Sequence, residues 1–365
     1  MLKKFAVTNY RGFKERIELD LSDPNGYEYN TFAIKDGVVK DLMIYGPNGA
    51  GKSNLGFALF DIVNHLTTKN KQSQSYANFS YAGNDLPVYF EYTFLFDGKE
   101  LVYEYSKNAA GILLIEKLTS DGTLLFDRQA DLIQINESLF TLQQTVKDNL
   151  LRQANNVSIV SYLANVFPMS KDHPIFLMSE FVENMLWFRC LQDRGYIGFE
   201  VGTTNIEEYI IENSLLDGFA KFVFSVSGQR FTFAKPQRGE KSIFCLIDGR
   251  RIALSAIEST GTSSLTLLYY WLSKLSEASF VFIDEFDAFY HYELAFSVCK
   301  RLFDQPCQVI LTTHNTSLMT NDLLRPDCYF LIDGKKVKPL NKCTSKELRL
   351  GHNLEKLYRG DGFEL

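Results

Sequence analysis

Hydrophobic and polar residues alternate near the start of the chain, as in strands with one buried face. Phe5, Val7, Phe13, Ile17 and Leu19 are separated by polar positions, and a turn at 23–26 follows them. The same alternation returns from 87 to 128, around the turn dipeptides Asp97-Gly98 and Asp121-Gly122. The first region predicts a β module that builds the edge of a sheet, and the second, from 87 to 128, predicts an antiparallel β meander.

A second pattern consists of short, continuous apolar runs. Residues 42–45 form one such run, which stops at a glycine-rich loop, and apolar residues then recur with helical spacing over 53–66. Two further runs, 280–284 and 308–312, have the composition of buried parallel strands, and a helix is predicted from about 263 to 275. Strands and helices in this order predict an α/β fold.

The middle of the chain has helical spacing in several pieces between 136 and 221. We therefore expect three parts. Residues 1–135 form an N-terminal part with the glycine-rich loop and the alternating strands, 136–221 a helical insertion, and 222–365 a C-terminal part, in which strands return over 222–247.

Composition and charge narrow the function classes. The 365 residues are 45% hydrophobic, which excludes disorder as the main state. A net charge of −6 argues against a chain that coats nucleic acid, so contact with DNA would need a local basic stripe. Six cysteines without a C-x-x-C pair indicate reduced thiols, and no signal peptide or membrane span is predicted. We expect a cytoplasmic protein.

The strongest motif is the loop at 46–53, whose sequence GPNGAGKS fits G-x-x-x-x-G-K-[ST] between a strand and a helix. Backbone N–H groups of such a loop surround the β-phosphate of ATP, the lysine bridges two phosphates, and the serine hydroxyl ligates Mg²⁺. The predicted ATP-binding residues are Asn48, Gly49, Ala50, Gly51, Lys52 and Ser53. Lys52 also counts as catalytic, and Ser53 as a metal ligand.

Two later strands end in further candidate groups. The run at 280–284 ends in Asp284 and Glu285, which fits one carboxylate for Mg²⁺ and a second as general base for the attacking water. A strand ending in a solvated acidic turn is the plain alternative. His314 follows the next strand and is placed to bind the γ-phosphate and that water, although an isolated histidine is usually structural.

Residues 258–265, ESTGTSSL, precede the predicted helix and resemble the signature segment of ABC-type ATPases. In that class a serine and the glycine backbone contact the γ-phosphate of ATP held by a second subunit. The corresponding residues are Ser259, Gly261 and Thr262. An ordinary helix N-cap is the alternative for this segment.

With these motifs in order, the chain resembles the RecF/SMC/OLD branch of ABC-type ATPases, and most closely the bacterial AAA-15 family. The resemblance also includes NYRGF at 9–13, IDEFD at 283–287, TTHN at 312–315 and LRPD at 324–327. Tyr292 departs from the proline common in the family, and the glutamine of the Q-loop is left open among Gln72, Gln74, Gln129 and Gln134.

The resemblance implies an ABC-type P-loop ATPase head, with a mixed sheet, an antiparallel β subdomain and a helical insertion. It further implies ATP and Mg²⁺ as ligands and an ATP-dependent homodimer or higher homo-oligomer.

Three functions are compatible with these features. In the first, the chain is an ATPase switch that controls an effector encoded nearby in an anti-phage defence system, and it has no nuclease activity of its own. In the second, it is a RecF-like DNA-binding ATPase, whose basic stripe would come from Lys69 with Lys71, from 235–241 with Arg250 and Arg251, or from 335–338. In the third, ATP is a structural clamp with negligible turnover.

Overall fold

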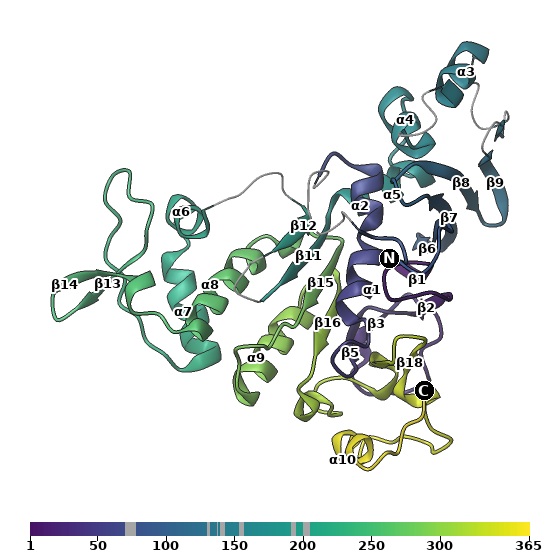
Figure 1. Cartoon of the computed structure of the whole chain (residues 1–365). Helices are drawn as coiled ribbons and strands as arrows, with labels where there is room; N and C mark the ends of the chain where they lie inside the picture. The colour runs from purple at the N-terminus through teal and green to yellow at the C-terminus, as the bar shows by residue number, and fades with distance from the viewer. Residues whose placement is uncertain are drawn as a thin grey trace.

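The computed structural model describes residues 1–69, 78–129, 132–136, 138, 143–152, 157–190, 195–199 and 205–365. Within these residues the chain forms two seven-stranded sheets and two small two-stranded ones, β3 (Ile34–Lys35) with β4 (Val38–Val39) and β13 (Phe244–Ile247) with β14 (Arg250–Ala253). The large sheets are joined through one helical layer (Figure 1).

The central sheet has the strand order β12-β11-β15-β16-β5-β17-β18. Its strands are β5 (Asp41–Tyr45), β11 (Met185–Arg189), β12 (Tyr196–Gly198), β15 (Phe280–Asp284), β16 (Gln308–Thr313), β17 (Tyr329–Ile332) and β18 (Val337–Pro339). The five inner strands are parallel, and each edge strand pairs antiparallel with its neighbour. Every residue of β5, β15 and β16 is buried, as continuous apolar strands covered on both faces should be.

The second large sheet is antiparallel, with the order β10-β9-β8-β7-β6-β1-β2. Its strands are β1 (Leu2–Thr8), β2 (Ile17–Asp20), β6 (Val88–Phe96), β7 (Lys99–Lys107), β8 (Leu113–Ser120), β9 (Thr123–Gln129) and β10 (Leu132–Ile135). Asp97 and Gly98 join β6 to β7, and both have positive φ, as a two-residue hairpin turn requires. The meander and the α/β class are thus confirmed.

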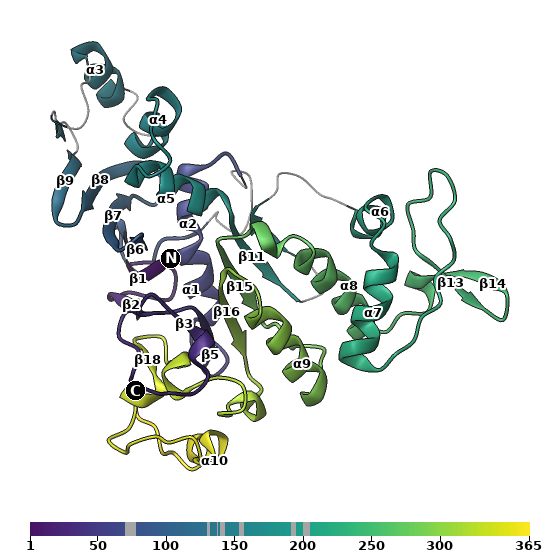
Figure 2. The same ribbon diagram turned by 180° about the vertical axis from the view of Figure 1, so that it is seen from behind.

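Helices cover the central sheet on both faces. On the side of the antiparallel sheet lie α1 (Lys52–Leu59) and α2 (Asp61–Leu66), and on the opposite side lie α8 (Thr260–Leu272) and α9 (Tyr292–Phe303) (Figure 2). Gly56 allows α1 to approach the central sheet, because a Cβ there would be 2.7 Å from the ring of Phe282. The remaining helices are α3 (Gln144–Arg152), α4 (Ile159–Val166), α5 (Pro174–Glu183), α6 (Ile206–Glu212), α7 (Leu216–Ser227) and α10 (Leu354–Arg359).

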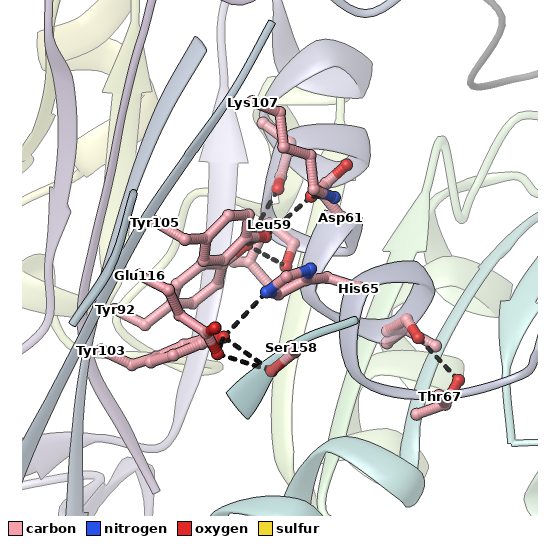
Figure 3. Close-up of polar contacts among 12 residues, drawn as sticks. Leu59, Asp61, His65, Thr67, Tyr92, Tyr103, Tyr105, Lys107, Glu116 and Ser158 are labelled. Carbon is pink, nitrogen blue, oxygen red and sulfur yellow. Dashed lines mark hydrogen bonds and ion pairs between the residues drawn. The ribbon is translucent and has the colours of Figure 1, made fainter. Parts of the chain in front are cut away.

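A buried polar cluster fixes α2 against the antiparallel sheet (Figure 3). The hydroxyl of Tyr105 and the amine of Lys107 both donate to Asp61 Oδ2, each at 2.7 Å. Next to them, the hydroxyl of Tyr92 donates to the carbonyl oxygens of Ala58 and Leu59, each at 3.1 Å, where α1 ends. The helix that starts at the phosphate loop is therefore anchored at its far end by two neighbouring strands.

Glu116 of β8 extends this polar cluster to α4. Its Oε1 accepts hydrogen bonds from the hydroxyls of Tyr103 at 2.8 Å and Ser158 at 2.6 Å, and its Oε2 accepts from the backbone N–H of Ile159 at 2.8 Å. His65 Nε2 of α2 lies 2.8 Å from the Tyr103 hydroxyl. The carboxylate thus satisfies N–H groups at the start of α4, where negative charge is favoured.

Two sequence-based assignments are wrong in part. The segment 136–221 is not helical throughout, because β11 and β12 lie inside it and β11 pairs with β15 in the central sheet. The strands expected from 222 onward begin only at Phe244, because α7 continues to Ser227 with Phe222, Val223 and Val226 on its buried face. The three-part division at 135/136 and 221/222 remains a prediction.

None of the helices in the described part of the chain combines the length and the apolar character that a membrane crossing requires.

Candidate functional site

The glycine-rich loop at 46–53 connects β5 to α1 and borders a cavity of about 200 Å³. The cavity is lined by Asn48, Gly49, Gly51, Lys52, Ser53, Asn54, Glu285 and His314. Gly51 is required here, since its φ is 96° and a Cβ would be 2.6 Å from the ring of Phe13. Ala50 is buried, and its backbone N–H donates to the Pro47 carbonyl at 3.2 Å. The loop is thus already folded into a turn, and its residues Asn48, Gly49 and 51–53 border the cavity.

Lys52 and His314 meet inside this cavity. Lys52 Nζ lies 2.9 Å from His314 Nε2 and donates to the Gly46 carbonyl at 2.8 Å. Burial, and then the positive charge of Lys52, hold the pKa of His314 below its ordinary value of 6.5. The imidazole is therefore neutral at pH 7, and its Nε2 is the natural acceptor for the ammonium group. Burial also lowers the pKa of Lys52, against the opposing charges of Asp284 and Glu285.

Asp284, at the end of β15, is fully buried and holds three partners. Ser53 Oγ donates to its Oδ2 at 2.7 Å, Thr312 Oγ1 donates to its Oδ1 at 2.8 Å, and Arg189 Nη2 lies 3.2 Å from Oδ2. A serine hydroxyl and a carboxylate in direct contact form the oxygen-rich donor set that Mg²⁺ prefers. These two side chains fit a Mg²⁺ ion, whose other ligands would be phosphate oxygens and water.

Glu285 directly follows the strand and lines the cavity opposite the loop. Its φ is 50°, a left-handed conformation that is rare for a residue with a side chain, and its N–H donates to Thr312 Oγ1 at 2.8 Å. This turn separates the two acids, so that Asp284 faces Ser53 while Glu285 faces the open cavity.

A second pair of residues joins the ends of β15 and β16. Thr313 Oγ1 donates to Asp287 Oδ1 at 2.7 Å, and the N–H of Asn315 donates to Thr313 Oγ1 at 2.9 Å. Burial raises the pKa of Asp287. These contacts fix the backbone on both sides of His314.

The signature-like residues lie elsewhere, at the start of α8. Ser259 is the N-cap and accepts the N–H of Thr262 at 3.2 Å, and the Thr262 hydroxyl, which is buried, donates to Gln229 at 3.1 Å. Neither these residues nor Gly261 lines the cavity of the phosphate loop. An N-cap therefore exists here, and contact with ATP would have to come from the phosphate loop of another subunit.

Several candidates are placed away from the loop or lie outside the described residues. Gln129 ends β9 and Gln134 is on β10, at the outer edge of the antiparallel sheet, and neither lines the cavity. Gln72, Gln74 and Lys71 lie outside the described residues. Tyr292 is the first residue of α9 and is 41% exposed.

Among the described residues, Arg189 contacts the site and Asn54 lines its cavity, although the sequence analysis indicated neither. Arg189 ends β11, where the parallel register places it beside Asp284 of β15. A short apolar run ended by a charged residue is the only local signal, and the same pattern had identified Asp284.

Within the described residues, no group of three or more histidine, cysteine, aspartate or glutamate side chains is arranged to hold a metal ion. The oxygen pair of Ser53 and Asp284 is thus the metal-binding feature that the geometry offers.

Strand, glycine-rich loop and helix, followed by an acid at the end of a neighbouring parallel strand, define a P-loop nucleotide-binding protein. The chain belongs to the AAA_21 family, described as "AAA domain, putative AbiEii toxin, Type IV TA system", which matches residues 42–320. No curated protein matches the sequence.

Several solved structures are similar to the chain. The SMC head bound to the C-winged helix domain of ScpA is 14% identical, with a TM-score of 0.49 over 93% of this chain and 98% of that one. The SMC head domain from Thermotoga maritima is 16% identical, with a TM-score of 0.43 over 93% and 98%. The recombination mediator RecF with ATP is 14% identical, with a TM-score of 0.41 over 93% and 99%.

Proposed function

We propose that the chain is a cytoplasmic ATP-binding and ATP-hydrolysing switch, which dimerises around ATP and controls an associated effector in a bacterial anti-phage defence system. The observation that carries the ATPase part is the convergence of Lys52, Ser53, Asp284, Glu285 and His314 on one loop cavity. These residues come from three parallel strands or the turns after them, where ligands of α/β sheets bind.

Binding of ATP would use the loop and its lysine. The N–H groups from Asn48 to Ser53 surround the β-phosphate, and Lys52, now bonded to the Gly46 carbonyl, exchanges that neutral acceptor for charged phosphate oxygens. Ser53 and Asp284 would hold Mg²⁺, which neutralises charge on the β- and γ-phosphates when bound.

Hydrolysis requires a base for the attacking water. Glu285 accepts a proton from the water while the water oxygen bonds to the γ-phosphorus. The bond from that phosphorus to the β–γ bridging oxygen then breaks, which gives ADP and inorganic phosphate. Neutral His314 orients the γ-phosphate or the water by a hydrogen bond from its ring.

Dimerisation would complete the site. Ser259 and the Gly261 backbone at the N-terminus of α8 are offered to the γ-phosphate of a second subunit, where a helix N-terminus favours an anion. ADP lacks that phosphate, so only ATP joins the two subunits, and their separation after hydrolysis would signal to the effector. The toxin named in the family description supports a pairing with a toxic activity.

A RecF-like DNA-binding ATPase is the second candidate. Parts of its expected basic stripes are neutralised within the chain, since Lys69 pairs with Glu183 at 2.7 Å and Lys241 with Glu208 at 2.9 Å. The run at 335–338 keeps this candidate open, because Lys335 and Lys336 are exposed.

The experiment that tests the ATPase is the release of phosphate by the purified chain with ATP and Mg²⁺. Glu285→Gln should lower turnover by roughly 10²-fold or more while ATP remains bound. Glu277→Gln, an exposed acid before β15, is the matched control and should hydrolyse at the parental rate. Parental turnover in Glu285→Gln would assign the base to another residue.

The effector part is tested by co-purification from the native operon. The chain alone should not cut DNA or RNA with ATP and Mg²⁺, and a second protein should be retained or released differently by Glu285→Gln. A nuclease activity that follows this chain alone through several columns, and disappears on mutation outside the ATP site, would contradict the proposal.

A further inference from the structure

Residues of α7, α8 and α9 line a second hollow. Figure 2 shows these helices on the face of the central sheet opposite to α1 and α2. The hollow has a volume of about 560 Å³, and it shares no lining residue with the phosphate-loop cavity. Phe222, Leu272 and the ring of Tyr269 supply an apolar surface in this α7–α9 groove. Volumes of this size accommodate a few side chains of a ligand or partner.

The charges that line the α7–α9 groove are positive. Among the described residues that line it, Lys221 of α7 and Arg301 of α9 are the charged ones, and both are exposed, although the chain carries a net charge of −6. No carboxylate in the described part of the chain forms an ion pair with either one, and Arg301 has a single 3.5 Å contact with the hydroxyl of Ser225. Their charge is available to a partner.

The groove is also a built feature of the fold. Gly218 lets α7 approach α8, because a Cβ there would be 2.3 Å from the Tyr269 hydroxyl, which donates to the Leu215 carbonyl at 3.2 Å. The ring of Tyr269 packs on Phe219 and Phe222, with centroids 5.3 Å away in both cases. The apolar surface is therefore fixed before any partner arrives, which lowers the entropic cost of binding.

We propose that the α7–α9 groove docks a segment of a partner protein that carries both acidic and apolar side chains. The apolar side chains would cover Phe222 and Leu272, and the carboxylates would pair with Lys221 and Arg301 at the rim. An acidic segment is selected because a basic one would meet two unpaired cations and no acid among the lining residues.

The groove is connected to the signature-like turn by one helix. Leu272 is the last residue of α8 and Ser259 is its N-cap, so the helix spans about 20 Å between the groove and the surface offered to a second subunit. A partner that shifts the end of α8 would thereby change the position of Ser259. The identification of this partner as the effector rests on the proposed switch function, whereas the docking itself does not.

The test is a selection from a displayed library of random peptides on the full chain without nucleotide. Selected peptides should combine acidic with apolar residues, and Lys221→Glu/Arg301→Glu should weaken their binding by ~10-fold or more. Lys335→Glu/Lys336→Glu makes the same change of charge elsewhere and should leave affinity unchanged.

Three results would overturn the proposal. The first is that no selected peptide binds the parent more tightly than Lys221→Glu/Arg301→Glu, and the second is that the selected peptides lack acidic residues. The third is self-association of the chain that Lys221→Glu/Arg301→Glu abolishes. The last result would make a second copy the occupant. Because the described residues that line the groove are all different from those that line the phosphate-loop cavity, a normal ATPase rate with failed selection separates this proposal from the proposed function.

Discussion

Lys52 Nζ and His314 Nε2 lie 2.9 Å apart, although 262 residues separate them in the chain. One residue follows β5 and the other follows β16, and these strands are parallel neighbours in which Tyr45 is opposite Thr313. The ends of parallel strands meet at one edge of a sheet, so the pairing of these two strands is what assembles the cavity. Because the pKa of His314 is lowered, the contact joins the ammonium group of Lys52 to a neutral imidazole ring.

Lys52→Ala should reduce ATP affinity by at least ~100-fold, because it removes the cationic side chain found among the described lining residues and leaves the carboxylate of Glu285 without that opposing charge. Titration calorimetry with ATP measures the effect. Lys171→Ala, an exposed lysine outside the lining of the cavity, serves as the control. Equal affinity in Lys52→Ala and the parent would refute the assignment of the loop.

Arg189 should raise the Mg²⁺ concentration that half-maximal ATP hydrolysis requires. Its guanidinium contacts the carboxylate oxygen of Asp284 that also accepts from Ser53, so it competes electrostatically with a metal ion there. Arg189→Gln should lower the Mg²⁺ concentration for half-maximal turnover several-fold, whereas Arg189→Lys should keep the parental value because the charge remains. If the Mg²⁺ concentration for half-maximal turnover rises or stays constant in Arg189→Gln, Arg189 acts on structure alone.

Asp41 should make the folded state less stable as pH rises. Burial raises the pKa of Asp41 to about 8, although the amine of Lys40 lies 3.0 Å away. The folded chain thus keeps a proton that the unfolded chain releases above its ordinary pKa of 3.8, so stability from this group falls between pH 4 and pH 8.

Urea unfolding of the parent and Asp41→Asn at pH 5, 6 and 7 measures this dependence. The difference in unfolding free energy should change by up to ~1.4 kcal/mol for each pH unit, in favour of Asp41→Asn at higher pH. Lys40 keeps its bonds to the carbonyls of Phe303 and Gln305 in both proteins. A difference that does not vary with pH would contradict the raised pKa.

Glu116→Gln should destabilise the fold by ~2 kcal/mol, because a buried carboxylate with several donors is replaced by an amide that cannot accept from all of them. Denaturant unfolding is the measurement. Glu18→Gln, in an exposed ion pair with Arg16, should cost under ~0.5 kcal/mol. Equal small effects would show that the polar cluster around α2 does not anchor α4.

Local sequence signals were sufficient for the phosphate loop and for its two flanking elements. The apolar run of β5, the glycines and the helical spacing of α1 are contiguous, so no distant contact was needed to recognise them. The central strand β11 was missed for the opposite reason. Its five residues are too few to distinguish strand from helix by periodicity, and its conformation depends on pairing with β15, about 95 residues later.

The same limit applies to the site. A motif was enough to propose Asp284 and Glu285 as site residues, but the contact of Arg189 with Asp284 exists only through the register of two strands. The left-handed turn at Glu285, which separates the two carboxylates, has no signature in the sequence, since it depends on the Thr312 hydroxyl of a neighbouring strand.

The proposed dimer has ATP bound by the phosphate loop of one subunit, and Ser259 and Gly261 of the other subunit complete that binding site. Light scattering on Glu285→Gln, which should retain ATP, measures this most directly when ATP and ADP are compared at one protein concentration. We expect the mass at least to double with ATP and to stay unchanged with ADP, and Lys52→Ala should keep the ADP mass with either nucleotide. An identical mass with ATP and ADP in Glu285→Gln would contradict the proposed dimer.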